Sequence, residues 1–267
     1  MEKQKSIGIF DSGVGGLSIG LAIKKILPYE NIDYFADFAC SPYGNKSQSF
    51  INQRSENIVN FLIKQNCKIV VLACNTATVN SISNLRSKIS VPLIGVEPAI
   101  KPAALNSKTG VIGVLATQQT IESTSFKLLK SQYENKVKIL SKACPDFVTL
   151  VENLNHNRQQ SYDVAEQYLR PLLNQECDQI VLGCTHFSFL SSVINQVAGN
   201  KVNIIDTAIP VAMQVKRILI DNNLENLGND TVTRNFWASE TSPIFAKAIE
   251  ELWGENIRIN LVETISN

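Results

Sequence analysis

Two stretches of the sequence place a cysteine in the same setting: CKIVVLACN at residues 67–75 and CDQIVLGCT at residues 177–185. In each, an apolar run typical of a buried strand leads to Cys74 or Cys184, and small polar residues that suit a helix start follow. Backbone N–H groups at a helix start lower the pKa of a thiol. A lone cysteine is more often a buried apolar residue, but two at matched places indicate a reactive pair.

Two thiols that approach one carbon from opposite sides suit a proton transfer. One thiolate removes a proton from one face of a carbon acid, and the opposite thiol returns a proton to the other face. In the reverse reaction the two groups exchange roles, so this chemistry favours equal groups related by approximate two-fold symmetry. Cys67 and Cys177 lie at the other ends of the same runs, and we expect them to pack in the core.

The elements that position these thiols follow the βαβ pattern of an α/β fold. Runs rich in Ile and Val, typical of parallel strands covered on both faces, alternate with segments of helical spacing. The predicted strands are 6–10, 32–36, 68–73, 92–96, 110–115, 136–140, 178–183 and 202–206. The predicted helices are 17–27, 48–64, 77–89, 99–106, 118–131, 186–196 and 207–222, with a polar helical stretch after residue 140.

The chain also repeats itself weakly. IGIFDS at 7–12 matches IGVLAT at 112–117, the two cysteine runs match, and VPLIG at 91–95 matches VNIID at 202–206, in the same order. We infer two similar α/β halves that begin near Ile7 and Gly110. The stretch TVTRNFWAS and a helix near 243–252 have no counterpart, and we expect them to pack onto the first half.

Ligands of open parallel sheets gather at the carboxyl ends of the strands. The polar residues predicted at these ends are Asp11, Ser12, Asp37, Cys74, Asn75, Thr76, Thr117, Thr120, Cys184, Thr185 and His186. If the halves face each other, these groups line one cleft. Asp11 and His186 are then placed to assist Cys74 and Cys184. The amide and hydroxyl side chains suit binding of carboxylates, because they add no competing base.

The stretch DSGVGGLS at 11–18 supports an alternative hypothesis. A glycine-rich turn after a first strand, with Asp37 further along the chain, is similar to the fingerprint of nucleotide-binding oxidoreductases that use NAD. The match is imperfect, since Ser18 takes the place of the third glycine and Asp11 would point a negative charge at a pyrophosphate. The same glycines would also let backbone N–H groups approach a carboxylate closely.

Composition excludes several classes of function. The 267 residues carry 25 basic and 24 acidic side chains, so we expect neither a nucleic acid partner nor a membrane-binding patch. Six cysteines without a CxxC pair, and only two histidines, lack the spacing of a zinc site. The N-terminus is unlike a signal peptide and no apolar run is long enough to span a membrane, so the expected location is cytoplasmic. No metal or other cofactor is expected.

Together these pieces resemble the cofactor-independent glutamate racemases of the aspartate/glutamate racemase superfamily. The motifs run in order from Ile7 to about Val215: IGIFDSGVGGLS, SPYGNKS, LACNTAT, IGVEPAIKPA, ACPDFVTLVE and LGCTHF. The resemblance implies two pseudo-symmetric, doubly wound α/β domains with mostly parallel sheets and an active site in the cleft between them. The implied limits are residues 1–98 plus 210–267 for the first domain and 99–209 for the second.

The resemblance also implies the roles of individual residues. Cys74 and Cys184 match the two proton-transferring cysteines, Asp11 and His186 match assisting residues, and Asp37 and Glu152 match acidic groups at or near the site. The positions that match substrate-contacting motifs are Asp11, Ser12, Tyr43, Gly44, Asn75, Thr76, Thr120, Thr185 and His186. Two departures from the family pattern are DFACSPYG for DTARVPYG, which places Cys40 near the site, and THFSFL for THYPLL, which introduces Ser188. Their effect on the shape of the pocket stays open, whereas the catalytic cysteines are unchanged.

The implied activity is interconversion of L- and D-glutamate, which supplies D-glutamate for bacterial peptidoglycan. The stretch GVEPAIKPAA is similar to the subset of these enzymes from Gram-negative bacteria, some of which respond to a UDP-muramyl precursor, so the resemblance leaves open whether such an activator acts here. A monomer and a homodimer are both compatible with the resemblance. The alternatives are an aspartate or hydantoin racemase of the same superfamily, the nucleotide-binding oxidoreductase, and a protein that acts by binding DNA gyrase.

Overall fold

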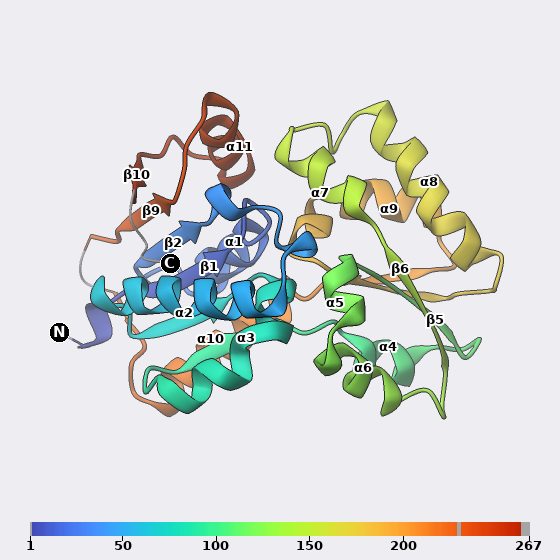
Figure 1. The fold of residues 1–267 in the computed structure, drawn as a ribbon, viewed down its shortest axis with the longest axis horizontal. Helices are drawn as coiled ribbons and strands as arrows, with labels where there is room; N and C mark the ends of the chain where they lie inside the picture. Colours follow the sequence, from blue (N-terminus) through green and yellow to red (C-terminus); the bar gives the residue numbers. More distant parts are fainter. Residues whose placement is uncertain (1, 229–230, 263–267) are drawn as a thin grey trace.

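The computed structural model describes residues 2–228 and 231–262 and consists of two α/β halves that lie side by side (Figure 1). Every strand pairing in both sheets is parallel. The first sheet has the order β10–β9–β2–β1–β3–β4, with β1 (Ile7–Asp11), β2 (Ile32–Ala36), β3 (Ile69–Leu72), β4 (Leu93–Gly95), β9 (Arg234–Ala238) and β10 (Ile259–Leu261). The second has the order β6–β5–β7–β8, with β5 (Val111–Ala116), β6 (Lys138–Ala143), β7 (Gln179–Gly183) and β8 (Asn203–Ile205).

The order β2–β1–β3–β4 in the first sheet recurs as β6–β5–β7–β8 in the second, with the strands in the same sequence along the chain. The predicted α/β fold with two pseudo-symmetric, mostly parallel sheets is therefore confirmed. Strand β9 pairs with β2, so the chain after residue 233 adds to the first sheet as expected. Strand β10 was not predicted. The predicted domain limits, which fall at Pro98 and within helix α10, stay a prediction.

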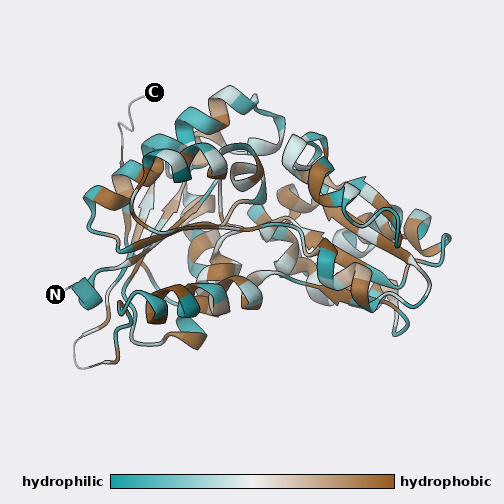
Figure 2. Ribbon diagram, turned by 90° about the horizontal axis from the view of Figure 1, so that it is seen from below, coloured by the Kyte–Doolittle hydropathy of each residue, from teal (hydrophilic) through white to brown (hydrophobic). Residues whose placement is uncertain are grey.

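Helices cover both faces of each sheet, and the strands between them are predominantly apolar (Figure 2). The helices are α1 (Leu17–Ile26), α2 (Gln48–Lys64), α3 (Asn75–Lys88), α4 (Ile100–Asn106), α5 (Gln118–Glu122), α6 (Thr124–Ser131), α7 (Pro145–Glu152), α8 (Gln159–Leu173), α9 (Ser191–Ala198), α10 (Ala208–Asp221) and α11 (Pro243–Trp253). Short 3-10 helices are η1 (Glu2–Gln4), η2 (Phe38–Cys40), η3 (Tyr43–Asn45) and η4 (Thr185–Leu190).

Two helix predictions were wrong in detail because side chains end helices locally. The segment predicted as one helix at 118–131 breaks at Ser123, whose backbone is extended and whose hydroxyl accepts from the Phe126 N–H at 3.1 Å. The segment predicted as a helix from 186 begins as the 3-10 helix η4, and α9 starts only at Ser191. Helix α3 begins earlier than expected, directly after Cys74, which makes this cysteine its N-cap.

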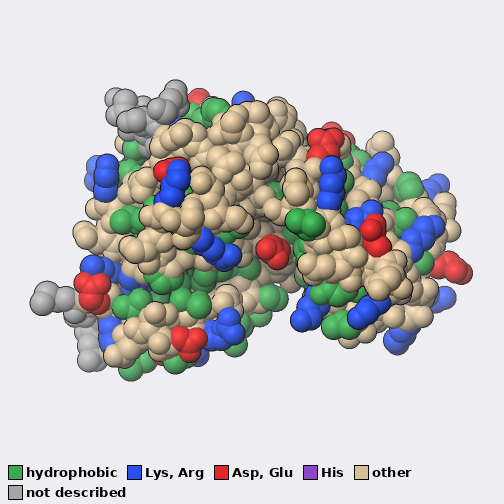
Figure 3. Space-filling view, turned by 60° about the horizontal axis from the view of Figure 1, so that its bottom comes forward, with side chains coloured by type: hydrophobic (Ala, Val, Ile, Leu, Met, Phe, Trp, Pro, Cys, Tyr) green, Lys and Arg blue, Asp and Glu red, His purple; other side chains and the backbone are tan. Residues whose placement is uncertain are grey.

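The apolar core connects the two halves. Its largest cluster includes Ile9 and Ala73 of the first half together with Leu182 and Phe187 of the second, all fully or almost fully buried. Burial of this kind holds the halves in contact below a surface that is indented where they meet (Figure 3). Among the described residues, no helix is both long enough and apolar enough to cross a membrane.

Candidate active site

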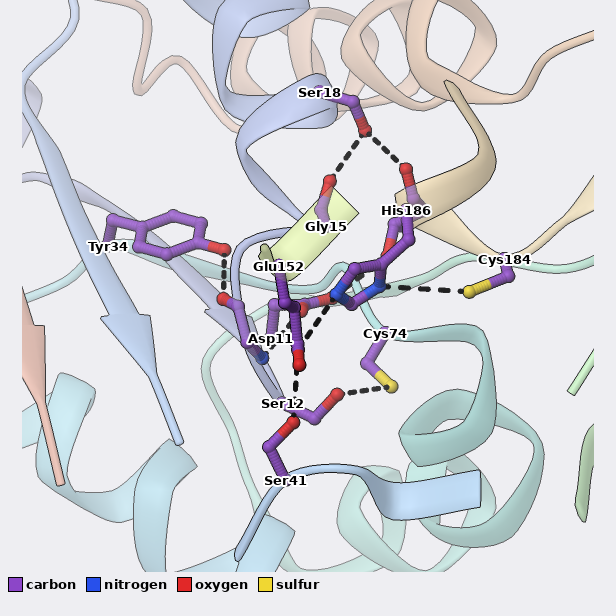
Figure 4. A network of polar contacts seen from close by, with 12 residues as sticks. Asp11, Ser12, Gly15, Ser18, Tyr34, Ser41, Cys74, Glu152, Cys184 and His186 are labelled. Atoms are coloured by element: carbon purple, nitrogen blue, oxygen red, sulfur yellow. Dashed lines mark hydrogen bonds and ion pairs between the residues drawn. The ribbon is translucent and has the colours of Figure 1, made fainter. Parts of the chain in front are cut away.

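Cys74 and Cys184 occupy equivalent places in the two halves, each within two residues of the end of a strand that pairs with β1 or β5. Cys74 follows β3 and Cys184 follows β7. The two residues are only 6% and 7% exposed. Figure 4 shows their side chains in one polar network that both halves build. The structure therefore brings the two predicted thiols to the boundary between the halves.

The sulfur of Cys74 has two polar neighbours at the start of α3. It accepts from the backbone N–H of Ala77 at 3.4 Å, and the Ser12 hydroxyl lies 3.6 Å away. Burial nevertheless raises the pKa of Cys74 to about 12, and the Asp11 carboxylate adds to the rise, while the two neighbours oppose it. The sequence-based expectation that the helix start lowers the pKa was therefore wrong in its net sign, because desolvation outweighs the helix start.

Cys184 has a different partner, the imidazole of His186. Its sulfur lies 3.8 Å from His186 Nδ1, and the other ring nitrogen, Nε2, lies 3.1 Å from Oε1 of Glu152. Burial alone would lower the pKa of His186, but hydrogen bonds to Cys184 and Glu152 outweigh it and raise the pKa well above 6.5. A protonated His186 places a positive charge beside the Cys184 sulfur. The predicted link between His186 and Cys184 is thus present in the geometry.

Asp11 connects the halves rather than contacting Cys74 directly. Its Oδ1 accepts from the Gly13 N–H at 2.8 Å, and its Oδ2 accepts from the Thr185 hydroxyl at 3.0 Å. Burial raises the pKa of Asp11, although the charge of His186 and these hydrogen bonds act in the opposite direction. The sequence analysis paired Asp11 with Cys74, whereas the hydroxyl beside that sulfur belongs to Ser12.

Asp37 lies at the centre of a buried ionic group that is linked to the surroundings of Cys74 through Tyr43. Arg54 on α2 binds it with two hydrogen bonds, Nε to Oδ2 at 2.9 Å and Nη2 to Oδ1 at 2.7 Å. The Tyr43 hydroxyl donates to Oδ2 at 2.6 Å, and the Tyr43 ring packs in the same apolar cluster as Cys74. The sequence analysis missed Arg54. A fully buried carboxylate requires a nearby cation, but the sequence did not show which of the basic residues supplies it.

A cluster of three hydroxyls, Thr76, Thr117 and Thr120, joins the halves on the other side of the site. The oxygen of Thr76 lies 2.9 Å from that of Thr117 and 3.3 Å from that of Thr120, and the latter two are 2.9 Å apart. Gly44 packs against the same group, since a Cβ built on it would lie 3.3 Å from Thr117 Cβ. Thr117 was expected at a strand end but was not among the predicted substrate-binding residues.

Asn75 is the residue whose surroundings point most directly to a ligand. It is 2% exposed, and neither its side-chain oxygen nor its side-chain nitrogen has a hydrogen-bond partner among the described residues. Buried polar groups are almost always paired in folded proteins. The amide therefore suits a ligand that offers both an acceptor and a donor, such as a carboxylate next to an ammonium group.

The glycine-rich turn at 13–16 is covered by the second half. A Cβ built on Gly15 would lie 2.4 Å from His186 Nδ1 and 2.5 Å from the Thr185 hydroxyl, and one built on Gly13 would lie 2.5 Å from Glu152 Oε1. The turn has glycines because other side chains pack tightly against it. Since these residues occupy the face where a pyrophosphate would lie, the dinucleotide hypothesis for this motif is wrong.

Three other cysteines, Cys40, Cys67 and Cys177, and the predicted pocket residue Ser188 are not part of the thiol pair. Cys67 and Cys177 fill equivalent places beside Gly8 and Gly113, where added Cβ atoms would lie 3.0 and 3.2 Å from the sulfurs, so their packing role is confirmed. Cys40 is half-buried beside Asp37. The carbonyl of Ser188 accepts from the Ser191 hydroxyl at 2.6 Å. The described residues contain no group of three or more His, Cys, Asp or Glu that could hold a metal ion.

Comparisons with known proteins found similarity over most of the chain. The family model described as Asp/Glu/Hydantoin racemase matches residues 29–215. A glutamate racemase of Methylococcus capsulatus is 40% identical over 247 residues, which cover 92% of this chain and 91% of the relative.

Two solved structures resemble the whole chain. Glutamate racemase isoform RacE1 from Bacillus anthracis has a TM-score of 0.87 and 32% identity, and the match covers 99% of this chain and 100% of the other. Glutamate racemase of Escherichia coli, in complex with L-glutamate and the activator UDP-MurNAc-Ala, has a TM-score of 0.86 and 31% identity, with 96% and 98% covered.

Proposed function

The chain belongs to the Asp/Glu/Hydantoin racemase family, and from this premise we propose that Cys74 and Cys184 racemise glutamate by a two-thiol proton transfer. The enzyme is an isomerase that interconverts L- and D-glutamate, the activity named for its curated relative and for its structural neighbours. The observation that carries the mechanism is the pair of buried thiols at equivalent strand ends of two pseudo-symmetric halves.

The reaction needs no group beyond the two sulfurs to carry the proton. One thiolate takes the α-proton, and the electron pair of the broken C–H bond stays on the α-carbon, delocalised towards the adjacent carboxylate. The opposite thiol then donates its proton to the other face and becomes the thiolate. With a pKa of about 12, Cys74 rests as a thiol and is ready to donate. In this direction the thiolate of Cys184, beside the His186 imidazole, is the group that accepts the α-proton.

The reverse direction requires Cys74 to lose its proton. Burial is the main reason for its high pKa, so a cation that enters the site has a strong effect there. The α-ammonium group of glutamate supplies this cation when the α-carbon lies between the sulfurs. Asp11 balances the ammonium charge and, through Thr185, fixes the loop that carries Cys184.

Uncharged donors hold the two carboxylates of the substrate in this proposal. Asn75 contributes the unpaired amide, and the hydroxyls and backbone of neighbouring residues complete the site. The proposed substrate-contacting residues are Asp11, Ser12, Tyr43, Gly44, Asn75, Thr76, Thr120, Thr185 and His186. Neutral donors bind carboxylates without offering a second base that would compete for the α-proton. All these residues come from one chain, so a monomer and a homodimer are equally compatible with catalysis.

The test is racemisation of each enantiomer in deuterated buffer without any added cofactor. We expect solvent deuterium at the α-carbon of the product. Cys74→Ala and Cys184→Ala should each lose at least about 10³-fold in kcat while keeping the fold, because each removes one proton carrier. Cys177→Ala is the matched control, since it removes a thiol of the same repeat that only packs. Near-normal turnover in either of the first two variants would contradict the mechanism.

Rates with aspartate and with hydantoins distinguish this substrate from those of other members of the family. We expect glutamate to have the highest kcat/KM, because it is the substrate named for the curated relative and the structural neighbours. A protein that racemised none of these compounds, yet bound DNA gyrase with both cysteines replaced, would favour the binding role instead.

Two further proposals concern the role of the reaction in the cell and its regulation. The D-glutamate produced would supply peptidoglycan synthesis in the cell. A UDP-muramyl precursor is proposed as an activator, by analogy with the Escherichia coli racemase, whose structure contains UDP-MurNAc-Ala. Initial rates with and without that compound test this step, and an unchanged kcat/KM at a saturating concentration would contradict it.

A further inference from the structure

We propose that Ser41 is a positioning residue for Cys184, acting across the boundary between the halves through Glu152 and His186. This inference rests on the proposed function, because it assigns a role within the same proton transfer. It concerns a residue that the sequence analysis did not select and whose side chain contacts neither cysteine in the described hydrogen-bond network.

The geometry is a chain of four side chains (Figure 4). The Ser41 hydroxyl donates to Glu152 Oε1 at 3.2 Å, and the same oxygen lies 3.1 Å from His186 Nε2. The opposite ring nitrogen of His186 then lies 3.8 Å from the sulfur of Cys184. Ser41 belongs to the first half, whereas the other three residues belong to the second. A single carboxylate oxygen thus receives one donor from each half.

The loop that carries Ser41 is held at several points, so its hydroxyl has a defined position. The Ser41 N–H donates to the Phe38 carbonyl at 3.1 Å, and the Ala39 N–H donates to the Ser239 hydroxyl at 3.0 Å. Asp37 at the start of the loop is bound by Arg54. On the facing side, Gly13 leaves room for the contact, because a Cβ there would lie 2.5 Å from Glu152 Oε1.

The hydroxyl has two effects on the residues beyond it. It fixes the direction of the Glu152 carboxylate and hence the plane of the His186 ring, which sets the approach of Nδ1 to the Cys184 sulfur. It also shares the negative charge of Oε1 with the imidazole, so it limits how strongly Glu152 raises the pKa of His186. The other titratable groups that face His186 are Asp11 and Cys184. Loss of the hydroxyl should therefore disturb proton transfer at Cys184 and leave Cys74 unaffected.

Isotope effects distinguish this role from a general loss of structure. For each enantiomer, the deuterium isotope effect on kcat/KM from an α-deuterated substrate reports how far removal of that α-proton limits the rate. Slowing the step at Cys184 should raise the effect for the enantiomer that Cys184 deprotonates and lower it for the other. A merely loosened fold would change both effects in the same direction or neither.

The experiment compares the wild type with Ser41→Ala, Ser41→Thr and Ser239→Ala. Ser41→Ala should lose about tenfold in kcat, the order expected for a hydrogen bond to a charged group, with the opposite isotope shifts. Ser41→Thr keeps a hydroxyl and should recover most of the rate. Ser239→Ala removes a hydrogen bond to the same loop without touching Glu152, so both isotope effects should stay at their wild-type values.

The proposal has a second, independent check. In a Glu152→Gln background, adding Ser41→Ala should change kcat by less than about twofold, because the path through the carboxylate is already broken. Parallel isotope shifts in Ser41→Ala, equal shifts in Ser239→Ala, or additive losses in the double variant would each overturn the inference. If the wild type racemises glutamate and Ser41→Ala has the same kcat and isotope effects, this inference alone is overturned. A wild type without racemase activity would overturn the proposed function as well.

Discussion

Replacing Arg54 with methionine removes the cation that faces the buried carboxylate of Asp37. The pair is almost completely shielded, with 7% exposure for the Arg54 side chain and none for that of Asp37. The Tyr43 hydroxyl, at 2.6 Å, and the neighbouring Cys40 thiol remain beside that carboxylate, and neither carries a positive charge. Breaking a buried ion pair from one side costs about 3–5 kcal/mol. For a chain of this length, that cost corresponds to a fall in Tm of about 6–20 °C.

Thermal unfolding and steady-state kinetics measure the consequence. Because Asp37 also holds Tyr43, which packs in the same cluster as Cys74, KM for glutamate should rise together with the fall in Tm. Arg54→Lys keeps the charge but not the two-pronged hydrogen bond, and it should be intermediate. The double variant Asp37→Asn/Arg54→Met removes both charges and should recover part of the lost stability. A Tm within about 2 °C of the wild type for Arg54→Met, or a double variant less stable than the single one, would refute the reasoning.

Three further predictions concern the site and its thiols. Asn75→Ala should raise KM for glutamate by about tenfold without lowering Tm, since the amide has no described protein partner to lose; a lower Tm with unchanged KM would argue against the ligand role. Gly15→Ala should lower kcat by about 100-fold, because the new Cβ would lie 2.4 Å from His186 Nδ1 and must displace the ring; wild-type kinetics would contradict this. The free energy of unfolding measured in urea should fall as pH rises above about 9. The unfolded chain loses thiol protons there, whereas buried Cys74 keeps its proton until pH about 12. A constant urea midpoint of unfolding from pH 8.5 to about 11 would refute this prediction.

The fold was largely predictable because its signals are local and repeated. Unalternated apolar runs mark buried parallel strands. The weak internal match between 7–12 and 112–117 corresponds to β1 and β5, which hold the same place in the orders β2–β1–β3–β4 and β6–β5–β7–β8. The break at Ser123 was missed because helical spacing continues across it, while a single hydroxyl cap decides where the next helix begins. Strand β10 was missed because three residues carry too little pattern.

The functional site, like the fold, could be predicted only in part. Cys74 and Cys184 could be found from sequence because their distance from the strand ends places them at the ligand-binding edge. The residues around them could not all be found, since Arg54 and Ser41 act through contacts between separate segments of the chain. The sign of the pKa shift at Cys74 was wrong because desolvation depends on how completely residues from several segments bury the sulfur.

The hydroxyl cluster of Thr76, Thr117 and Thr120 affects the rate of the catalytic cycle. Because the two sulfurs are only 6% and 7% exposed, we expect the halves to move apart at this edge when glutamate enters, which would break and remake the hydroxyl contacts in each cycle. Neutral hydroxyl pairs are worth only about 1 kcal/mol each, much less than a buried ion pair. They hold the halves together during chemistry yet release them quickly. Opening of the halves therefore limits the rate in part, and kcat should fall as solvent viscosity increases.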